Sequence, residues 1–151
     1  MVSPELMKEQ VLFEDLDDSE LRKIGGVVKE IRFKKGAHVF REKEDTKGIF
    51  LIHSGKVGIS KVTPAGWKQT LAVLAKGCFF GELSIIEHRV HEANAIALED
   101  TVVLFIPKEH FEKIETEDLL LATKIMKGLI LVLSRNLRQM NEKFLNALIS
   151  Y

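Results

Sequence analysis

The stretch "GELSIIEHRVHEANA", residues 81–95, combines residue types that suit a phosphorylated ligand. Gly81 permits a turn, and the next five residues can form a short helix whose first backbone N–H groups are available to an anion. The carboxylate of Glu82 could accept a hydrogen bond from a sugar hydroxyl. The loop that follows should then supply an arginine to face the phosphate, but it holds His91 and Glu92 instead.

The other reactive side chains show no pattern typical of catalysis or metal binding. The segment "EHRVHE", residues 87–92, holds two histidines and two acids, but the histidines are three positions apart in an expected loop, so we interpret it as solvated. Neither the G-x-S-x-G pattern of a nucleophile nor the G-x-x-x-x-G-K pattern of a phosphate loop occurs. Cys78, the single cysteine, is expected in the core and excludes an internal disulfide. We therefore predict a protein that is not an enzyme and holds no cofactor or metal.

The composition indicates one soluble domain spanning residues 1–151, with 46% apolar and 29% charged residues. The 22 Lys and Arg residues balance the 22 Asp and Glu residues, so the chain lacks the basic surplus typical of nucleic-acid-binding proteins. The most apolar stretch, residues 119–133, is interrupted by Lys124 and Lys127 and is shorter than the roughly 20 residues that cross a bilayer. The start of the sequence has no signal-peptide pattern, so we expect a cytoplasmic protein without membrane or nucleic-acid partners.

Hydrophobic periodicity divides the sequence into three zones. Residues 4–26 have the pattern of a helix, with Asp17 or Asp18 as an N-cap. Residues 27–107 contain about eight short apolar segments separated by glycine-containing turns, which is typical of a closed antiparallel jelly roll or of a sandwich. Residues 108–151 return to the helical period.

A long helix is predicted from Thr116 to Ile149. Within it, apolar residues recur at alternating steps of four and three, as do the a and d positions of a coiled coil. This stripe consists of Met126, Ile130, Leu133, Leu137, Met140, Phe144 and Ala147. A single helix cannot shield such a stripe from water, so either the barrel covers it or a second copy of the helix does. The regular repeat favours a homodimer.

Five segments, in order along nearly the whole chain, are similar to segments of one known family. They are "LFEDLDDSELRKI", "FKKGAHVFREKE", "GIFLIHSGKVGISK" around Gly55, "LAKGCFFGELSII" with Gly77, Gly81, Glu82 and Leu83, and "LSRNLRQMNEKFLNAL". On these segments the chain resembles the cyclic nucleotide-binding domain family, which includes bacterial catabolite-activator-type regulators, regulatory subunits of protein kinase A and cyclic-nucleotide-gated channels. The last segment is similar to the helix through which the bacterial regulators dimerise.

This resemblance implies a jelly-roll-like β-roll flanked by helices, whose phosphate-binding cassette, residues 79–95, takes cAMP or cGMP. Glu82 matches the family's glutamate that binds the ribose 2′-hydroxyl. Leu83 and Ser84 match positions whose backbone amides meet the cyclic phosphate. In the long helix, Asn141 lies near the position where catabolite-activator-type proteins place polar residues against the base.

The chain departs from the family at the arginine that pairs with the phosphate. The family has Pro-Arg-Ala-Ala or Arg-Ser-Ala there, whereas an ungapped alignment places Val90, His91 and Glu92 at these positions. Because histidine is mostly neutral at pH 7, we expect binding to weaken by roughly ten- to a hundredfold. Either Arg89 from a shifted loop or a protonated His91 could replace the arginine. Otherwise the cassette does not bind cyclic nucleotide tightly.

We therefore predict a non-catalytic cyclic nucleotide-binding-like sensor, homodimeric through the long helix, that signals to a downstream protein. An anion in the cassette would order residues 81–92 and shift the helix against the barrel. The alternative is a ligand-independent dimeric interaction module on the same fold, which His91 and Glu92 favour and the "FGEL" motif does not. Because the sequence ends at Tyr151, we expect no DNA-reading helix-turn-helix domain to follow.

Overall fold

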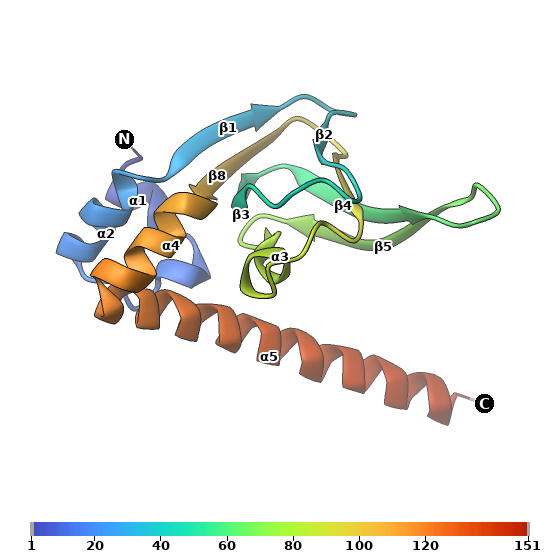
Figure 1. Cartoon of the computed structure of the whole chain (residues 1–151). Coiled ribbons are helices and arrows are strands. Elements are labelled where there is room, and N and C mark those ends of the chain that lie inside the picture. The colour runs from blue at the N-terminus through green and yellow to red at the C-terminus, as the bar shows by residue number, and fades with distance from the viewer. Residues whose placement is uncertain (1, 151) are drawn as a thin grey trace.

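Eight strands form two antiparallel sheets in the computed structural model, which describes residues 2–150 apart from the side chains of Ser84 and Ile85 (Figure 1). The first sheet has the order β1 (Lys29–Phe33), β8 (Thr101–Pro107), β3 (Gly48–Ser54), β6 (Phe79–Phe80). The second has the order β2 (His38–Phe40), β7 (Asn94–Ala97), β4 (Lys56–Val62), β5 (Lys68–Ala75). Buried side chains from both sheets form one shared core. The prediction of a mainly β, jelly-roll-like architecture is confirmed.

Strand β3 lies between β8 and β6, and most of it is buried on both faces. Ile49 and Leu51 belong to a core shared with the helices, whereas Phe50 and Ile52 belong to the core between the two sheets. Successive strand residues point to opposite faces, so a strand covered on both sides needs apolar residues at every position. This burial explains the continuous run "IFLI" and places β3 in the middle of three layers.

Helices from both ends of the chain cover the outer face of the first sheet (Figure 1). They are α1 (Pro4–Met7), the 3₁₀ helix η1 (Val11–Phe13), α2 (Asp18–Gly25), α4 (Lys108–Glu117) and α5 (Leu119–Ile149). Within residues 2–150, none of the helices combines the length and apolar character that a bilayer crossing requires.

The prediction of one helical zone over residues 4–26 is wrong, because three short helices occupy it. The carboxylate of Asp17 accepts a hydrogen bond from the Glu20 backbone N–H at 2.8 Å. The carboxylate of Glu20 accepts one in return from the Asp17 N–H at 3.0 Å. This capping box begins a new helix, α2, after the chain has turned, and it confirms Asp17 as the N-cap.

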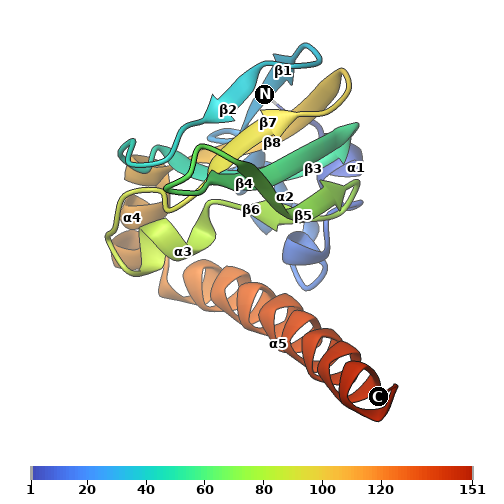
Figure 2. The same ribbon diagram turned by 90° about the vertical axis from the view of Figure 1, so that its right-hand side faces the viewer.

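Helix α5 begins three residues later than the predicted Thr116, because Asp118 interrupts the helical backbone with φ −139° and ψ 77°. The Asp118 carboxylate accepts a hydrogen bond from the Leu121 N–H at 3.2 Å and so caps the new helix. The first turns of α5 bury Leu121, Ile125 and Leu129 in the core that lies under the first sheet. The rest of the helix runs along the sheets and moves away from them toward the C-terminus (Figures 1 and 2).

Candidate functional site

A cavity of about 380 Å³ lies among the second sheet, the helix α3 (Glu82–Ile86), the loop after α3, and α5. Figure 2 shows α3 held between the strands and α5. The strands contribute the apolar residues Phe40, Ile59, Ala72, Leu74, Phe79 and Phe80. The remaining lining residues are Gly81, Glu82, Leu83, Glu87, Arg89, Val90, His91, Glu92, Ala93 and Asn136. A cavity of this size, with aromatic walls and a few polar groups, suits a small ligand.

Gly81 turns the chain from β6 into α3 with φ +85°, a conformation that favours glycine. A Cβ atom at this position would lie 3.0 Å from the carbonyl oxygen of Gly48, so the turn also needs close backbone contact. The turn brings Glu82 to the cavity wall, where only 8% of the residue is exposed. Burial raises the pKa of the Glu82 carboxyl, and a hydrogen bond from its own backbone N–H opposes this rise only in part.

The loop after α3 is fixed by hydrogen bonds to the segment that follows β2. The backbone N–H of His91 donates to the carbonyl of Glu44 at 3.0 Å, and the His91 carbonyl accepts from the Lys43 N–H at 2.7 Å. The Thr46 hydroxyl donates to the carbonyl of Arg89 at 3.0 Å. These bonds hold the backbone on both sides of the imidazole, so the position of His91 is set by residues about 45 positions earlier in the sequence.

The imidazole of His91 stacks on the ring of Phe40, with 3.6 Å between ring centroids and 3° between planes. Only 3% of His91 is exposed. Burial lowers the pKa of the imidazole, and the nearby charge of Glu44 opposes this effect in part. A histidine with a pKa below its ordinary value of about 6.5 is mostly uncharged at pH 7, so His91 brings little positive charge to the cavity at that pH.

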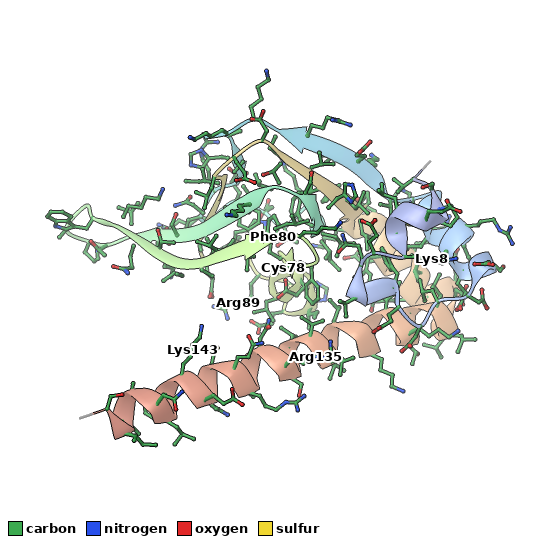
Figure 3. The ribbon with its side chains drawn as sticks, turned by 180° about the vertical axis from the view of Figure 1, so that it is seen from behind. Lys8, Cys78, Phe80, Arg89, Arg135 and Lys143 are labelled. Carbon is green, nitrogen blue, oxygen red and sulfur yellow. The ribbon has the colours of Figure 1, made fainter. Side chains whose placement is uncertain are left out.

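The guanidinium of Arg89 is bound by two carboxylates of its own loop. Its Nη1 atom lies 3.0 Å from Oε2 of Glu87, and its Nη2 atom contacts Oε1 of Glu92. Hydrogen bonding to Glu87 and the charges of both acids raise the pKa of Arg89, so it stays charged but neutralised by its neighbours. Figure 3 shows Arg89 in the space between the strands and α5, where Lys143 also extends from α5 toward the strands.

The structure brings five predicted ligand-binding residues to one cavity, namely Gly81, Glu82, Leu83, Arg89 and His91. Ser84 lies in α3, but its side chain is outside the described residues. Asn141 is exposed on α5 and is not among the residues that line the cavity.

Among the described residues of α5, Asn136 lines the cavity, and it was not predicted from the sequence. A signal was present, because Asn136 continues at helical spacing the stripe of Ile125, Leu129 and Val132, which packs against the barrel. A polar residue on this buried stripe marks the point where α5 passes the cavity. The stacking partner Phe40 had no comparable signal, because its contact with His91 depends on the path of a distant loop.

Known proteins of two kinds are similar to this chain. The cyclic AMP receptor protein of Thermus thermophilus is 30% identical over 105 residues, which are 70% of this chain and 49% of that protein. The cGMP-dependent protein kinase 2 of Mus musculus is 32% identical over 128 residues, covering 83% of this chain and 16% of the kinase. The crystal structure of the Thermus thermophilus catabolite activator protein superposes with a TM-score of 0.73 at 26% identity, over 89% of this chain and 62% of that one. The chain thus spans about half the length of the first relative and much less of the second.

A family model described as "Cyclic nucleotide-binding domain" matches residues 30–118. This range is more than half of the chain and contains β2 to β8, α3 and the cavity residues Glu82, Arg89 and His91. The match and the relatives agree with the two-sheet fold. The chain therefore belongs to the cyclic nucleotide-binding domain family.

Proposed function

We propose that this chain is a non-catalytic regulatory module whose cavity takes a small nucleotide-like ligand and binds cAMP and cGMP weakly. The observation that carries the proposal is the position of the cavity, which is lined by the Gly81–Leu83 turn and also by Asn136 of α5. A ligand there would contact the cassette and the long helix at once. If it binds one arrangement of α5 more tightly than another, it shifts the population toward that arrangement.

Weak binding of cyclic nucleotides is supported by the charges around the cavity. In the ungapped alignment His91 takes the place of the family's arginine, but its imidazole is stacked on Phe40 and burial lowers its pKa. Arg89 is close enough to line the cavity, but Glu87 and Glu92 occupy its guanidinium. Because a charge-assisted hydrogen bond contributes on the order of 1.5–3 kcal/mol, its loss weakens binding by roughly ten- to a hundredfold.

In this proposal two copies of the chain pair through the apolar stripe of α5, and this surface passes on the signal. We call it the seam; it consists of Met126, Ile130, Leu133, Leu137, Met140 and Phe144. Four of its members are more than half exposed: Ile130 at 65%, Leu137 at 59%, Met140 at 66% and Phe144 at 65%. Apolar residues at a and d spacing are stabilised by a second helix that covers them. A cytoplasmic location is part of the proposal and is supported by the use of a single cysteine in the whole sequence.

The proposal is tested by isothermal titration with cAMP and cGMP at pH 6 and pH 8. We expect saturable binding, about ten- to a hundredfold weaker than that of a family domain with the arginine, titrated alongside. Binding that is stronger at pH 6 and lost in His91→Gln would assign the phosphate contact to His91, and binding equal at both pH values and lost in Arg89→Ala would assign it to Arg89. Absence of heat from both ligands, with the fold confirmed by circular dichroism, would contradict cyclic nucleotide binding.

A second candidate is a dimeric interaction module that responds to no ligand. It is favoured by the ion pairs of Arg89 with Glu87 and Glu92, which satisfy the charges of the loop without any anion. The two candidates differ in one measurable property, because only the first predicts that a small molecule in the cavity changes the thermal stability of the protein.

A further inference from the structure

The charges that line the cavity are predominantly negative. Among its described lining residues are three carboxyl groups, on Glu82, Glu87 and Glu92, against one guanidinium, on Arg89. The fifth titratable residue, His91, is buried and stacked on an aromatic ring. An anion that enters this cavity meets a surplus of acids, and like charges at short distance repel.

Arg89 does not offset this surplus, because its single positive charge is paired with two carboxylates. Nη1 binds Glu87 and Nη2 binds Glu92, so the two carboxylates bind the guanidinium from the same loop that carries it. A phosphate that contacts Arg89 must share its charge with these carboxylates or displace one of them. In either case a carboxylate lies close to the phosphate, as a second negative charge at the cavity wall.

Other cations do not line the cavity in the described part of the chain. Lys143 extends from α5 toward the strands (Figure 3), but it is not among the lining residues. The backbone of His91 is held by Lys43 and Glu44 on both sides, which fixes the imidazole against Phe40. Neither Lys143 nor His91 therefore supplies, from the cavity wall, the positive charge that a phosphate needs.

The rest of the cavity suits an uncharged ring with hydroxyl groups. Phe40, Phe79 and Phe80 give the cavity an apolar wall, in which the ring of Phe40 is already stacked on His91. The Glu82 carboxyl, buried on the wall, can exchange hydrogen bonds with hydroxyl groups in either protonation state. The amide of Asn136 adds a donor and an acceptor from α5.

We propose that this cavity selects an uncharged planar heterocycle bearing hydroxyl groups over its phosphorylated form, and that Glu87 and Glu92 impose this choice by neutralising Arg89. The inference rests on the proposed function, since it names the ligand class for the same cavity. In this proposal Glu87 and Glu92 determine specificity, because they disfavour anionic ligands in a cavity that is large enough to hold such ligands.

The test compares adenosine and guanosine with cAMP and cGMP as probes, by isothermal titration of the wild-type protein and of the double variant Glu87→Gln/Glu92→Gln. We expect wild-type protein to bind a nucleoside at least about tenfold more tightly than the matching cyclic nucleotide. In the double variant, affinity for the cyclic nucleotide should rise about tenfold, the effect of freeing Arg89 from two exposed ion pairs, while affinity for the nucleoside changes less than about twofold.

Two further variants test whether the release of Arg89 causes the gain in affinity for cyclic nucleotides. The control Glu112→Gln/Glu117→Gln removes the same charge from ion pairs on α4, away from the cavity, and should leave all four affinities unchanged. Adding Arg89→Ala to the cavity double variant should remove the gain for cyclic nucleotides, because Arg89 is the group that the acids release.

The inference is overturned if wild-type protein binds cyclic nucleotides as tightly as nucleosides, or if the double variant gains nothing for cyclic nucleotides; in both cases the proposed function still stands. If none of the four probes gives binding heat with the wild-type protein or with the double variant, and both are folded, the proposed function and the inference are overturned together.

Discussion

At the scale of single residues, Glu82 combines a position that suits ligand binding with a cost to the fold. Its carboxyl is buried on the cavity wall, and burial raises its pKa. A carboxyl whose pKa is higher in the folded than in the unfolded state favours folding most when protonated, at pH values below its ordinary pKa of about 4.3. This contribution is lost as pH rises through the folded-state pKa. At neutral pH, Glu82 therefore destabilises the protein relative to an uncharged isostere.

We expect Glu82→Gln to raise the melting temperature at pH 7 by a few degrees, the shift that about 1 kcal/mol produces in a domain of this size. The gain should shrink at pH 4, where the wild-type carboxyl is largely protonated in both states. Thermal unfolding followed by circular dichroism at the two pH values measures both effects. The exposed Glu99→Gln serves as a control and should change little. An equal or larger gain at pH 4 would contradict a burial penalty on the charged form.

The residues of the site could be predicted only as far as local sequence determines them. Gly81 and Glu82 depend on a turn and a short helix that adjacent residues specify, and the structure places both on the cavity. The state of His91 could not be predicted, because Phe40 and the Glu44 carbonyl belong to a segment that approaches only in the folded protein. An ungapped alignment gives a side chain its position in the family, but its pKa depends on such distant neighbours.

At the scale of elements, the turn between β3 and β4 connects the two sheets through Gly55. This glycine has φ +94°, and a Cβ atom there would lie 2.4 Å from the hydroxyl oxygen of Thr101 and 2.7 Å from the carbonyl oxygen of Asp100. The Thr101 hydroxyl exchanges hydrogen bonds with the backbone of Lys56 at 3.2 Å. Any side chain at position 55 would therefore separate this turn from the turn between β7 and β8.

We expect Gly55→Ala to destabilise the protein by about 2–4 kcal/mol, since it combines backbone strain with a steric clash against buried atoms. Gly66, at the tip of the hairpin of β4 and β5, has a similar φ of +87° but no neighbouring atom within 4 Å of a Cβ. Gly66→Ala should accordingly cost only about 1 kcal/mol, the strain alone. Urea unfolding of both variants separates the cost of backbone strain from the cost of the steric clash. Equal losses in the free energy of unfolding would contradict the role of the Thr101 contact.

The elements themselves follow closely from sequence periodicity, and their errors have local causes. The strands alternate or run apolar according to whether one face or both are buried, as β3 shows. The start of α5 was predicted too early because "ETEDLL" is compatible with a helix, while the break at Asp118 depends on its carboxylate capping Leu121. A side-chain cap of this kind competes with helix continuation, and periodicity does not reveal which of them prevails.

At the scale of the whole molecule, α5 has one face that packs against the barrel and one that is exposed in the single chain. One face packs against the barrel through Leu121, Ile125 and Leu129 and reaches the cavity at Asn136. From the sequence, either the barrel or a second helix could cover the apolar stripe. In the structure the barrel covers only the first part of α5, and Ile130 and the apolar residues from Leu137 onward remain exposed. The same helix could thus connect ligand contact to pairing between copies.

We expect Leu137→Glu to convert a dimer into a monomer, because it places a charge at the centre of the seam formed by Met126, Ile130, Leu133, Leu137, Met140 and Phe144. Leu137 is 59% exposed in the single chain, so the substitution should leave the melting of the protomer fold nearly unchanged. Gln139→Glu adds the same charge two positions away, off the a and d stripe, and should leave the dimer intact. Sedimentation velocity of the three proteins at several concentrations measures the mass in solution. A monomeric wild-type protein, or a dimer that tolerates Leu137→Glu, would show that the seam does not pair two copies of this chain, and the exposed stripe would then need another partner to cover it.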